Sequence, residues 1–232
     1  MVNYRIGIFF SIVLLVLAGC QERAAETSTP PIIRVASDGV DPLNYALTDT
    51  LQKYFPARIQ LDSRSPTGNL RRIQESQAEL AIIPANLAYV AYTRGEGTPP
   101  RPYSELRSIA ALYTIPLILV ATEASGIRKL ADVHSKRVAV GPSESTTQIT
   151  VKMTLEGVGL SPADIIARFV NGDAAVGELR SGQVDAVFHR GNDPTATVSK
   201  LLKIPHVRFV PISRSETASI RLGHPFLRPI WI

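Results

Sequence analysis

Short strand-like segments alternate with helix-like segments along most of the chain, and this alternation limits the fold more than any other feature. Strand candidates lie at residues 32–37, 57–62, 79–83, 137–140, 167–170, 184–188 and 207–211. Helix candidates lie between them, at residues 43–54, 69–76, 87–92, 145–157, 174–181 and 195–202. In the first of these helices Leu43, Leu47, Leu51 and Tyr54 fall near one face. Alternating strands and helices predict an α/β fold with mostly parallel sheets.

A loose internal repeat predicts how those elements divide. The segment from Gln77 to Ile83 recurs as Gln183 to Phe188, and each copy enters a buried strand through an acidic residue, Glu79 or Asp185. The separation is too long for a solenoid repeat. We therefore expect two similar α/β lobes, with extended chain at 109–122 crossing between them.

The first 31 residues predict export and a membrane anchor. Residues 1–19 have a short basic start, an apolar run and small residues before Cys20, which is typical of a signal peptide. The sequence from Leu17 to Cys20, Leu-Ala-Gly-Cys, resembles the lipobox of bacterial lipoproteins and implies a diacylated Cys20. An ordinary signal peptide with an unmodified cysteine is the alternative. Residues 20–31 are polar and predict a flexible, lipid-anchored linker on the periplasmic side of either bacterial membrane.

Composition argues against several classes of function. Because Cys20 is the only cysteine, the chain cannot form an internal disulfide or a thiolate metal cluster. The net charge of +5 comes from scattered residues without a Lys/Arg block, which argues against a nucleic-acid partner. The four histidines form no H-E-x-x-H motif, and no G-x-S-x-G motif occurs. We expect no enzyme, metal or cofactor; a structural or ligand-contact role suits His189 better than that of a base.

Several segments in order carry a family resemblance. They are residues 69–73, 79–83, 88–92, 95–97, 106–113, 125–127, 130–133, 136–141 and 182–188. From residue 33 to residue 212 the chain resembles the TAXI branch of solute-binding proteins, which serve tripartite ATP-independent periplasmic (TRAP) transporters. The resemblance implies a two-lobe periplasmic-binding-protein fold of the second type, with the ligand in the cleft between the lobes. It also implies a small carboxylate or amino acid as ligand, and membrane permease subunits as partners.

The same resemblance suggests lobe boundaries. We assign residues 32–116 and 206–232 to the first lobe and residues 117–205 to the second. Family members continue beyond this length, so the first lobe is expected to be incomplete at its C-terminal end. The loop after the first strand carries Asp38 and Asp41 where the family has a glycine-rich loop. Such a loop disfavours a carboxylate ligand unless a cation compensates.

Candidate ligand contacts follow from strand ends, because open α/β sheets bind ligands outside the carboxyl ends of their strands. The candidates are Ser37, Asp38, Gly68, Asn69, Asn86, Tyr113, Ser143, Ser145, Thr146, Thr147, Arg190 and Asn192.

Each candidate also has a structural interpretation. The residues from Ser145 to Thr147 could hold an anion at a helix start or simply cap that helix, and Gly68 and Asn69 have the same two roles, with capping favoured. Asn86 could contact ligand or cap a helix. Tyr113 could wall the cleft or sit half-buried in a core. Arg190 could pair with an anion or lie solvated at the surface.

These features together predict an extracytoplasmic solute-binding lipoprotein that captures a small carboxylate or amino acid for a TRAP-type transporter. Two alternatives stay open. One is a ligand-sensing or accessory interaction lipoprotein without a transport role. The other is a truncated relative that does not bind solute.

Overall fold

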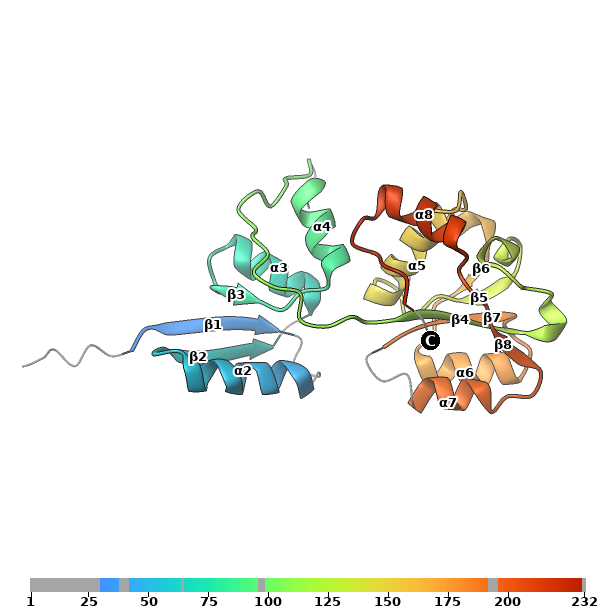
Figure 1. Cartoon of the computed structure of the whole chain (residues 1–232), viewed down its shortest axis with the longest axis horizontal. Helices are drawn as coiled ribbons and strands as arrows, with labels where there is room; N and C mark the ends of the chain where they lie inside the picture. The colour runs from blue at the N-terminus through green and yellow to red at the C-terminus, as the bar shows by residue number, and fades with distance from the viewer. Residues whose placement is uncertain (1–29, 38–41, 64, 96–98, 192–195, 231–232) are drawn as a thin grey trace, which may run out of the picture.

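The computed structural model describes residues 30–37, 42–63, 65–95, 99–191 and 196–230, which form two lobes side by side (Figure 1). Each lobe contains one sheet. The strand order is β2-β1-β3 in the first sheet and β6-β5-β7-β4-β8 in the second. The expected α/β architecture is confirmed. None of the helices in these ranges is long and apolar enough to span a bilayer.

The first sheet is parallel throughout. It contains β1 (Ile32–Ser37), β2 (Arg58–Ser63) and β3 (Leu80–Ala81), with β1 in the centre. Helix α2 (Pro42–Tyr54) covers one face, and α3 (Pro66–Gln74) and α4 (Ala85–Thr93) lie on the other (Figure 1). Leu70 and Leu87 are buried between α3 and α4 and form a small apolar cluster with Ala91 and Tyr103.

The second sheet is mixed. It contains β4 (Leu117–Thr122), β5 (Arg137–Ala139), β6 (Ile166–Arg168), β7 (Ala186–Arg190) and β8 (Val207–Phe209). Strand β4 runs antiparallel to both of its neighbours, β7 and β8, whereas β5 is parallel to β6 and β7. The helices are α5 (Thr146–Glu156), α6 (Gly172–Arg180), α7 (Ala196–Leu202) and α8 (Arg214–Gly223). Short 3-10 turns lie at Glu123–Ser125, Leu130–Val133 and Pro162–Asp164.

Strand β4 shows why this sheet is covered on both faces. Its side chains alternate between the faces, as the pleat of a strand requires. Leu119 and Ala121 belong to the core beneath α5 and α8. Ile118 and Val120 belong to the core beneath α6 and α7. All four are apolar because both faces of the strand are buried.

The internal repeat has a structural cause. In each lobe an arginine of one strand binds the acidic residue just before a neighbouring parallel strand: Arg34 of β1 binds Glu79 before β3, and Arg137 of β5 binds Asp185 before β7. Glu79 accepts hydrogen bonds from the backbone N–H and guanidinium of Arg34, which lowers the pKa of Glu79 to about 2. Asp185 accepts from the backbone N–H, Nε and Nη2 of Arg137 at 2.9, 3.1 and 2.7 Å. Both lobes therefore contain the same arginine–carboxylate contact at the entry to a parallel strand.

The C-terminal segment corrects one expectation. Residues 206–232 were assigned to the first lobe, yet β8 pairs with β4 and α8 packs against α5 in the second. Strand β8 follows α7 after a short turn, which places it beside β4. Gly157 allows the close approach of α8, since an ideal Cβ there would lie 2.5 Å from the Cα of Ile220. Phe226, beyond α8, reaches back to the first lobe, with its ring centroid 5.0 Å from that of Tyr89.

Two boundaries also differ from the sequence expectation. Only residues 117–122 of the predicted extended stretch form a strand. Helix α3 begins at Pro66, because Ser65 caps it.

Candidate functional site

The carboxyl edge of the second sheet brings several predicted residues together. The parallel strands β5 and β7 end at Ala139 and Arg190, and α5 begins just beyond, at Thr146. Gly141 in the connecting loop has φ +87°, and an ideal Cβ there would lie 2.8 Å from the Cβ of Thr147. Glycine thus allows the loop to fold closely onto the first turn of α5.

Arg190 is held against that first turn. Its Nη1 donates a hydrogen bond to Oγ1 of Thr146 at 3.0 Å, in a half-buried position. The start of a helix carries a partial positive charge and N–H groups without intrahelical acceptors. The guanidinium adds a full positive charge at the same point. This edge therefore favours an anion.

The neighbouring hydroxyl residues divide between capping and surface positions. The Oγ of Ser145 accepts from the backbone N–H of Gln148 at 3.2 Å, so Ser145 is the N-cap of α5. Thr147 is half-buried against Gly141, and Ser143 is exposed. Capping is thus confirmed for Ser145, and among these residues Thr146 makes the contact with Arg190.

The first lobe contributes a second edge of the same kind. Ser37 ends β1 and is fully buried, and its partner in the strand register is Ser63 at the end of β2. Helix α3 starts there, and Ser65 Oγ accepts from the N–H of Gly68 at 3.2 Å. Ser65 is therefore the N-cap of α3, and Gly68 supplies the N–H that Ser65 satisfies.

Asn69, one residue further along α3, is different. Its side chain is fully buried, and neither Oδ1 nor Nδ2 has a hydrogen-bond partner among the described residues. Leaving a buried amide unpaired costs about 1–3 kcal/mol, so such groups in native proteins usually meet a water or ligand. Among the described residues of the first lobe, Asn69 is a buried polar side chain whose donor and acceptor both lack a hydrogen-bond partner.

Asn86 does not cap α4. The N-cap of α4 is Pro84, and Nδ2 of Asn86 donates to Oγ1 of Thr150 in α5 at 3.1 Å. Asn86 thus forms a hydrogen bond between the two lobes. Ile149, the neighbour of Thr150, packs against the apolar cluster of the first lobe.

Tyr113 is partly exposed on the chain that connects the lobes. Its hydroxyl donates to Oδ1 of Asn44 in α2 at 3.5 Å, so the ring lies against the first lobe. Asp38, Asn192 and Cys20 lie outside the described residues.

His189 and Arg190 lie on opposite faces of β7 although they are adjacent in sequence. An ideal Cβ at Gly172, at the start of α6, would lie 4.0 Å from Nδ1 of His189, whereas Arg190 contacts α5. Burial lowers the pKa of His189, and its Nε2 has no partner among the described residues. His189 therefore does not share a site with Arg190. Within the described ranges, no three His, Cys, Asp or Glu side chains gather as metal ligands would.

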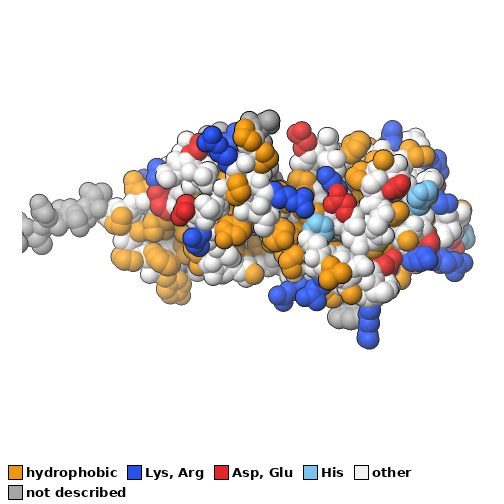
Figure 2. Space-filling view, turned by 90° about the horizontal axis from the view of Figure 1, so that it is seen from above, with side chains coloured by type: hydrophobic (Ala, Val, Ile, Leu, Met, Phe, Trp, Pro, Cys, Tyr) orange, Lys and Arg blue, Asp and Glu red, His pale blue; other side chains and the backbone are white. Residues whose placement is uncertain are grey.

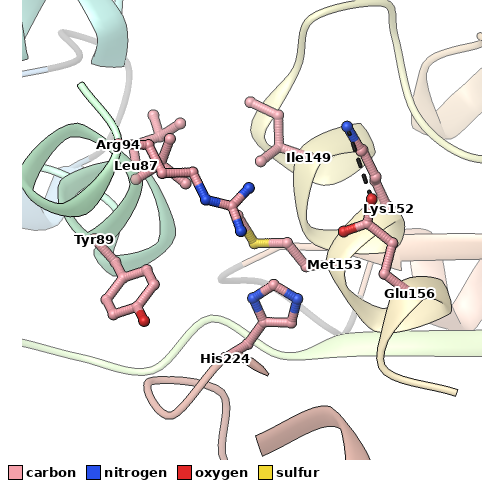
Figure 3. Close-up of a pocket in the computed structure, with 9 residues that line it drawn as sticks. Leu87, Tyr89, Arg94, Ile149, Lys152, Met153, Glu156 and His224 are labelled. Carbon is pink, nitrogen blue, oxygen red and sulfur yellow. Dashed lines mark ion pairs between the residues drawn. The ribbon is translucent and has the colours of Figure 1, made fainter. Parts of the chain in front are cut away.

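A cavity between α4 and α5 was not anticipated from the sequence (Figure 3). Its volume is about 250 Å³. The lining residues are Leu87, Tyr89, Val90, Arg94, Ile149, Lys152, Met153, Glu156 and His224, none of them a predicted site residue. The available signal was spacing: Leu87, Val90 and Arg94 share one face of α4, and Ile149, Met153 and Glu156 share one face of α5.

Comparison with known protein families shows the family to which the chain belongs. The model of the NMT1-like family matches residues 46–232. The chain belongs to the NMT1-like family. This membership agrees with the predicted relationship to solute-binding proteins at the level of fold and leaves the TAXI assignment untested.

Solved structures show the same fold. The periplasmic aliphatic sulphonate binding protein SsuA from Escherichia coli matches with a TM-score of 0.52 and 17% identity, covering 77% of this chain and 59% of that one. The periplasmic sulfonate-binding protein SsuA from Methylobacillus flagellatus matches with 0.50 and 14%, covering 79% and 56%. A Bacillus subtilis protein matches with 0.50 and 13%, covering 84% and 82%. The chain thus spans less than two thirds of the length of the two sulfonate-binding proteins, and the likeness establishes the periplasmic-binding-protein type of fold.

Proposed function

We propose that this protein is an exported solute-binding protein that holds a small anion between its lobes, at the carboxyl ends of the parallel strands. The observation that carries the proposal is the hydrogen bond from Arg190 to Thr146 at the first turn of α5. A guanidinium at a helix start offers a planar set of donors next to free backbone N–H groups. Carboxylates, sulfonates and phosphates all fit such donors.

Asn69 supports the proposal from the first lobe. Its buried amide carries both a donor and an acceptor without partners. Because α3 begins beside the ends of β1 and β2, Asn69 lies on the edge where a ligand of this fold type is expected. An anion with a further polar group would satisfy the amide, as would an ordered water beside the ligand.

The ligand class that we propose is a small organic anion, either a carboxylate such as an amino acid or a sulfonate. The carboxylate comes from the TAXI resemblance, and the sulfonate from the names of the two SsuA proteins. On the face that Figure 2 shows, Lys and Arg are spread over both lobes rather than gathered in one patch. The positive charge that favours an anion is the local one of Arg190 at the start of α5. We assign no catalytic role to this site.

The proposal includes a lipid anchor on Cys20 and a location on the periplasmic side of a membrane. A permease would receive the solute, and the TAXI resemblance makes a TRAP-type permease our choice. The Methylobacillus protein is instead assigned to a sulfonate ABC transporter. Solute uptake that persists after ATP depletion would support the TRAP partner, whereas loss of uptake would favour an ABC partner. A Cys20→Ala variant that stays in the membrane fraction would contradict the anchor.

A thermal-shift panel tests solute binding. The panel contains short alkanesulfonates, dicarboxylates, amino acids and uncharged sugars. A ligand that binds only the folded state raises the melting temperature by mass action, by about 2.7 kcal/mol of stability at a hundredfold excess over its Kd. We expect at least one anion to act, and no neutral solute.

Two variants test whether the rise in melting temperature comes from binding at Arg190. Arg190→Gln should abolish the shift, while Arg128→Gln, an exposed arginine elsewhere on the second lobe, should leave it unchanged. If the protein melts cooperatively and no anion moves the transition, solute capture is refuted. If a shift survives in Arg190→Gln, the anion binds elsewhere.

A further inference from the structure

The cavity between α4 and α5 lies apart from the strand ends. The hydrogen bond from Asn86 to Thr150 joins the two helices near their starts. The cavity lining begins at the next residue of α4, Leu87, and at Ile149 of α5, and continues toward the far ends of both helices. The lobes thus meet at the hydrogen bond and separate again around the cavity.

The charges in this cavity leave an excess of one positive charge. Lys152 and Glu156 of α5 lie 3.8 Å apart as an ion pair. The guanidinium of Arg94, at the end of α4, has no hydrogen-bond or ion-pair partner among the described residues, and Figure 3 shows it reaching toward Met153 and His224. The exposed guanidinium of Arg94, beside a compensated pair, is therefore available to an anionic group.

His224 adds a buried polar atom without a partner. The residue is 7% exposed, and its Nδ1 has no partner among the described residues. Burial and the charge of Arg94 lower the pKa of His224, against the opposing influence of Glu156. The ring is therefore neutral at neutral pH and can present one N–H to an acceptor.

The remaining walls are apolar and come from both lobes. Leu87 and Val90 line the cavity from α4, and Ile149 and Met153 line it from α5. The volume of about 250 Å³ lies just below the range of roughly 300–1,000 Å³ typical of pockets for drug-sized ligands. The space suits a compact body rather than a long chain.

We propose that this cavity is a second binding site, for a small apolar monocarboxylate. The carboxylate lies between the Arg94 guanidinium and the Nδ1–H of His224, and the hydrocarbon body contacts the four apolar side chains. Since α4 belongs to one lobe and α5 to the other, the bound acid holds the lobes in the arrangement described. This site does not depend on solute binding at the strand ends.

Met153 makes the test specific. The chain has two methionines, Met1 and Met153, so a methionine-methyl label places a single reporter among the described residues, on the cavity wall. Benzoate is the probe, with neutral benzamide as its uncharged counterpart. For a ligand of this size we expect a Kd on the order of 1 mM.

Benzoate should shift the Met153 methyl signal in a saturable way, and benzamide should not. Arg94→Ala, at an exposed position, should weaken benzoate by about tenfold or more, since hydrogen bonds to charged groups are among the strongest. His224→Phe keeps a ring and removes the donor, so it should weaken benzoate too, whereas Arg128→Ala should match the wild type. The proposal is overturned if the methyl signal does not respond to benzoate, if benzamide binds equally well, or if Arg94→Ala binds benzoate as the wild type does. None of these readings depends on the Arg190 site.

Discussion

Thr150→Val should destabilise the protein because it removes the acceptor of the interlobe hydrogen bond. Asn86 is 4% exposed, and its Nδ2 donates to Thr150 Oγ1 at 3.1 Å. Valine has nearly the same shape as threonine, so the substitution leaves almost no cavity and the destabilisation caused by lost packing is small. The donor of Asn86 is left buried without an acceptor, which costs about 1–3 kcal/mol. In a domain of this size that loss lowers the melting temperature by roughly 2–12 °C.

Thr154→Val is the matched control. Thr154 lies one turn further along α5, is equally buried, and its hydroxyl donates only to the backbone carbonyl of Thr150, at 2.8 Å. We expect this change to cost less than about 0.5 kcal/mol, because that carbonyl already accepts a helix hydrogen bond.

A double-mutant cycle with Asn86→Leu isolates the pair. The double variant replaces both partners with apolar groups, so its loss should be smaller than the sum of the single losses. The expected coupling energy is about 0.5–3 kcal/mol by urea unfolding. A coupling energy near zero, with Thr150→Val no worse than Thr154→Val, would refute the contact between α4 and α5.

Further changes test the packing and the buried histidine. Gly157→Ala should cost about 1–3 kcal/mol in urea unfolding, because its Cβ would press on the backbone of Ile220, and an unchanged stability would contradict the docking of α8 on α5. Gly177→Ala, inside α6 with open space around it, should instead stabilise by about 0.4–1 kcal/mol. Burial lowers the pKa of His189 below its usual value of about 6.5, so the unfolded chain takes up a proton first as the pH falls. The melting temperature should therefore drop below about pH 6.5, and less steeply in His189→Phe; parallel pH profiles would contradict this origin.

Much of the fold could be predicted from the sequence, because its causes are local. The strands β1, β5 and β7 are short apolar runs, and the repeat around Glu79 and Asp185 indicated two similar lobes. Helix α8 was missed although it carried a local signal. Ser213 and Glu216 form a capping box, with Ser213 accepting from the N–H of Glu216 and Glu216 accepting from the N–H of Ser213.

The site was less predictable, because one residue type serves two purposes. Ser145 caps α5 while Thr146, its neighbour, contacts Arg190, and both are small hydroxyl residues at a helix start. Asn86 was expected to cap a helix or bind ligand, but its partner Thr150 lies 64 residues away in the chain. A single sequence carries no signal for such a pairing.

The cavity residues were missed for a related reason. Arg94, Met153 and His224 come from three separate elements, and none stands at a strand end, where ligands of this fold are expected. Their proximity follows from how the two lobes and the C-terminal segment meet. That arrangement is a property of tertiary packing.

Hydrogen–deuterium exchange with and without the strongest anion of the panel tests the central claim most directly. The measurement compares peptides that cover residues 145–148 at the start of α5 with peptides that cover residues 66–69 at the start of α3. If the anion binds between the lobes at the strand ends, exchange slows in both regions, and Arg190→Gln abolishes the slowing. If the anion raises the melting temperature while both regions exchange unchanged, the solute does not bind at the strand ends and the account is wrong.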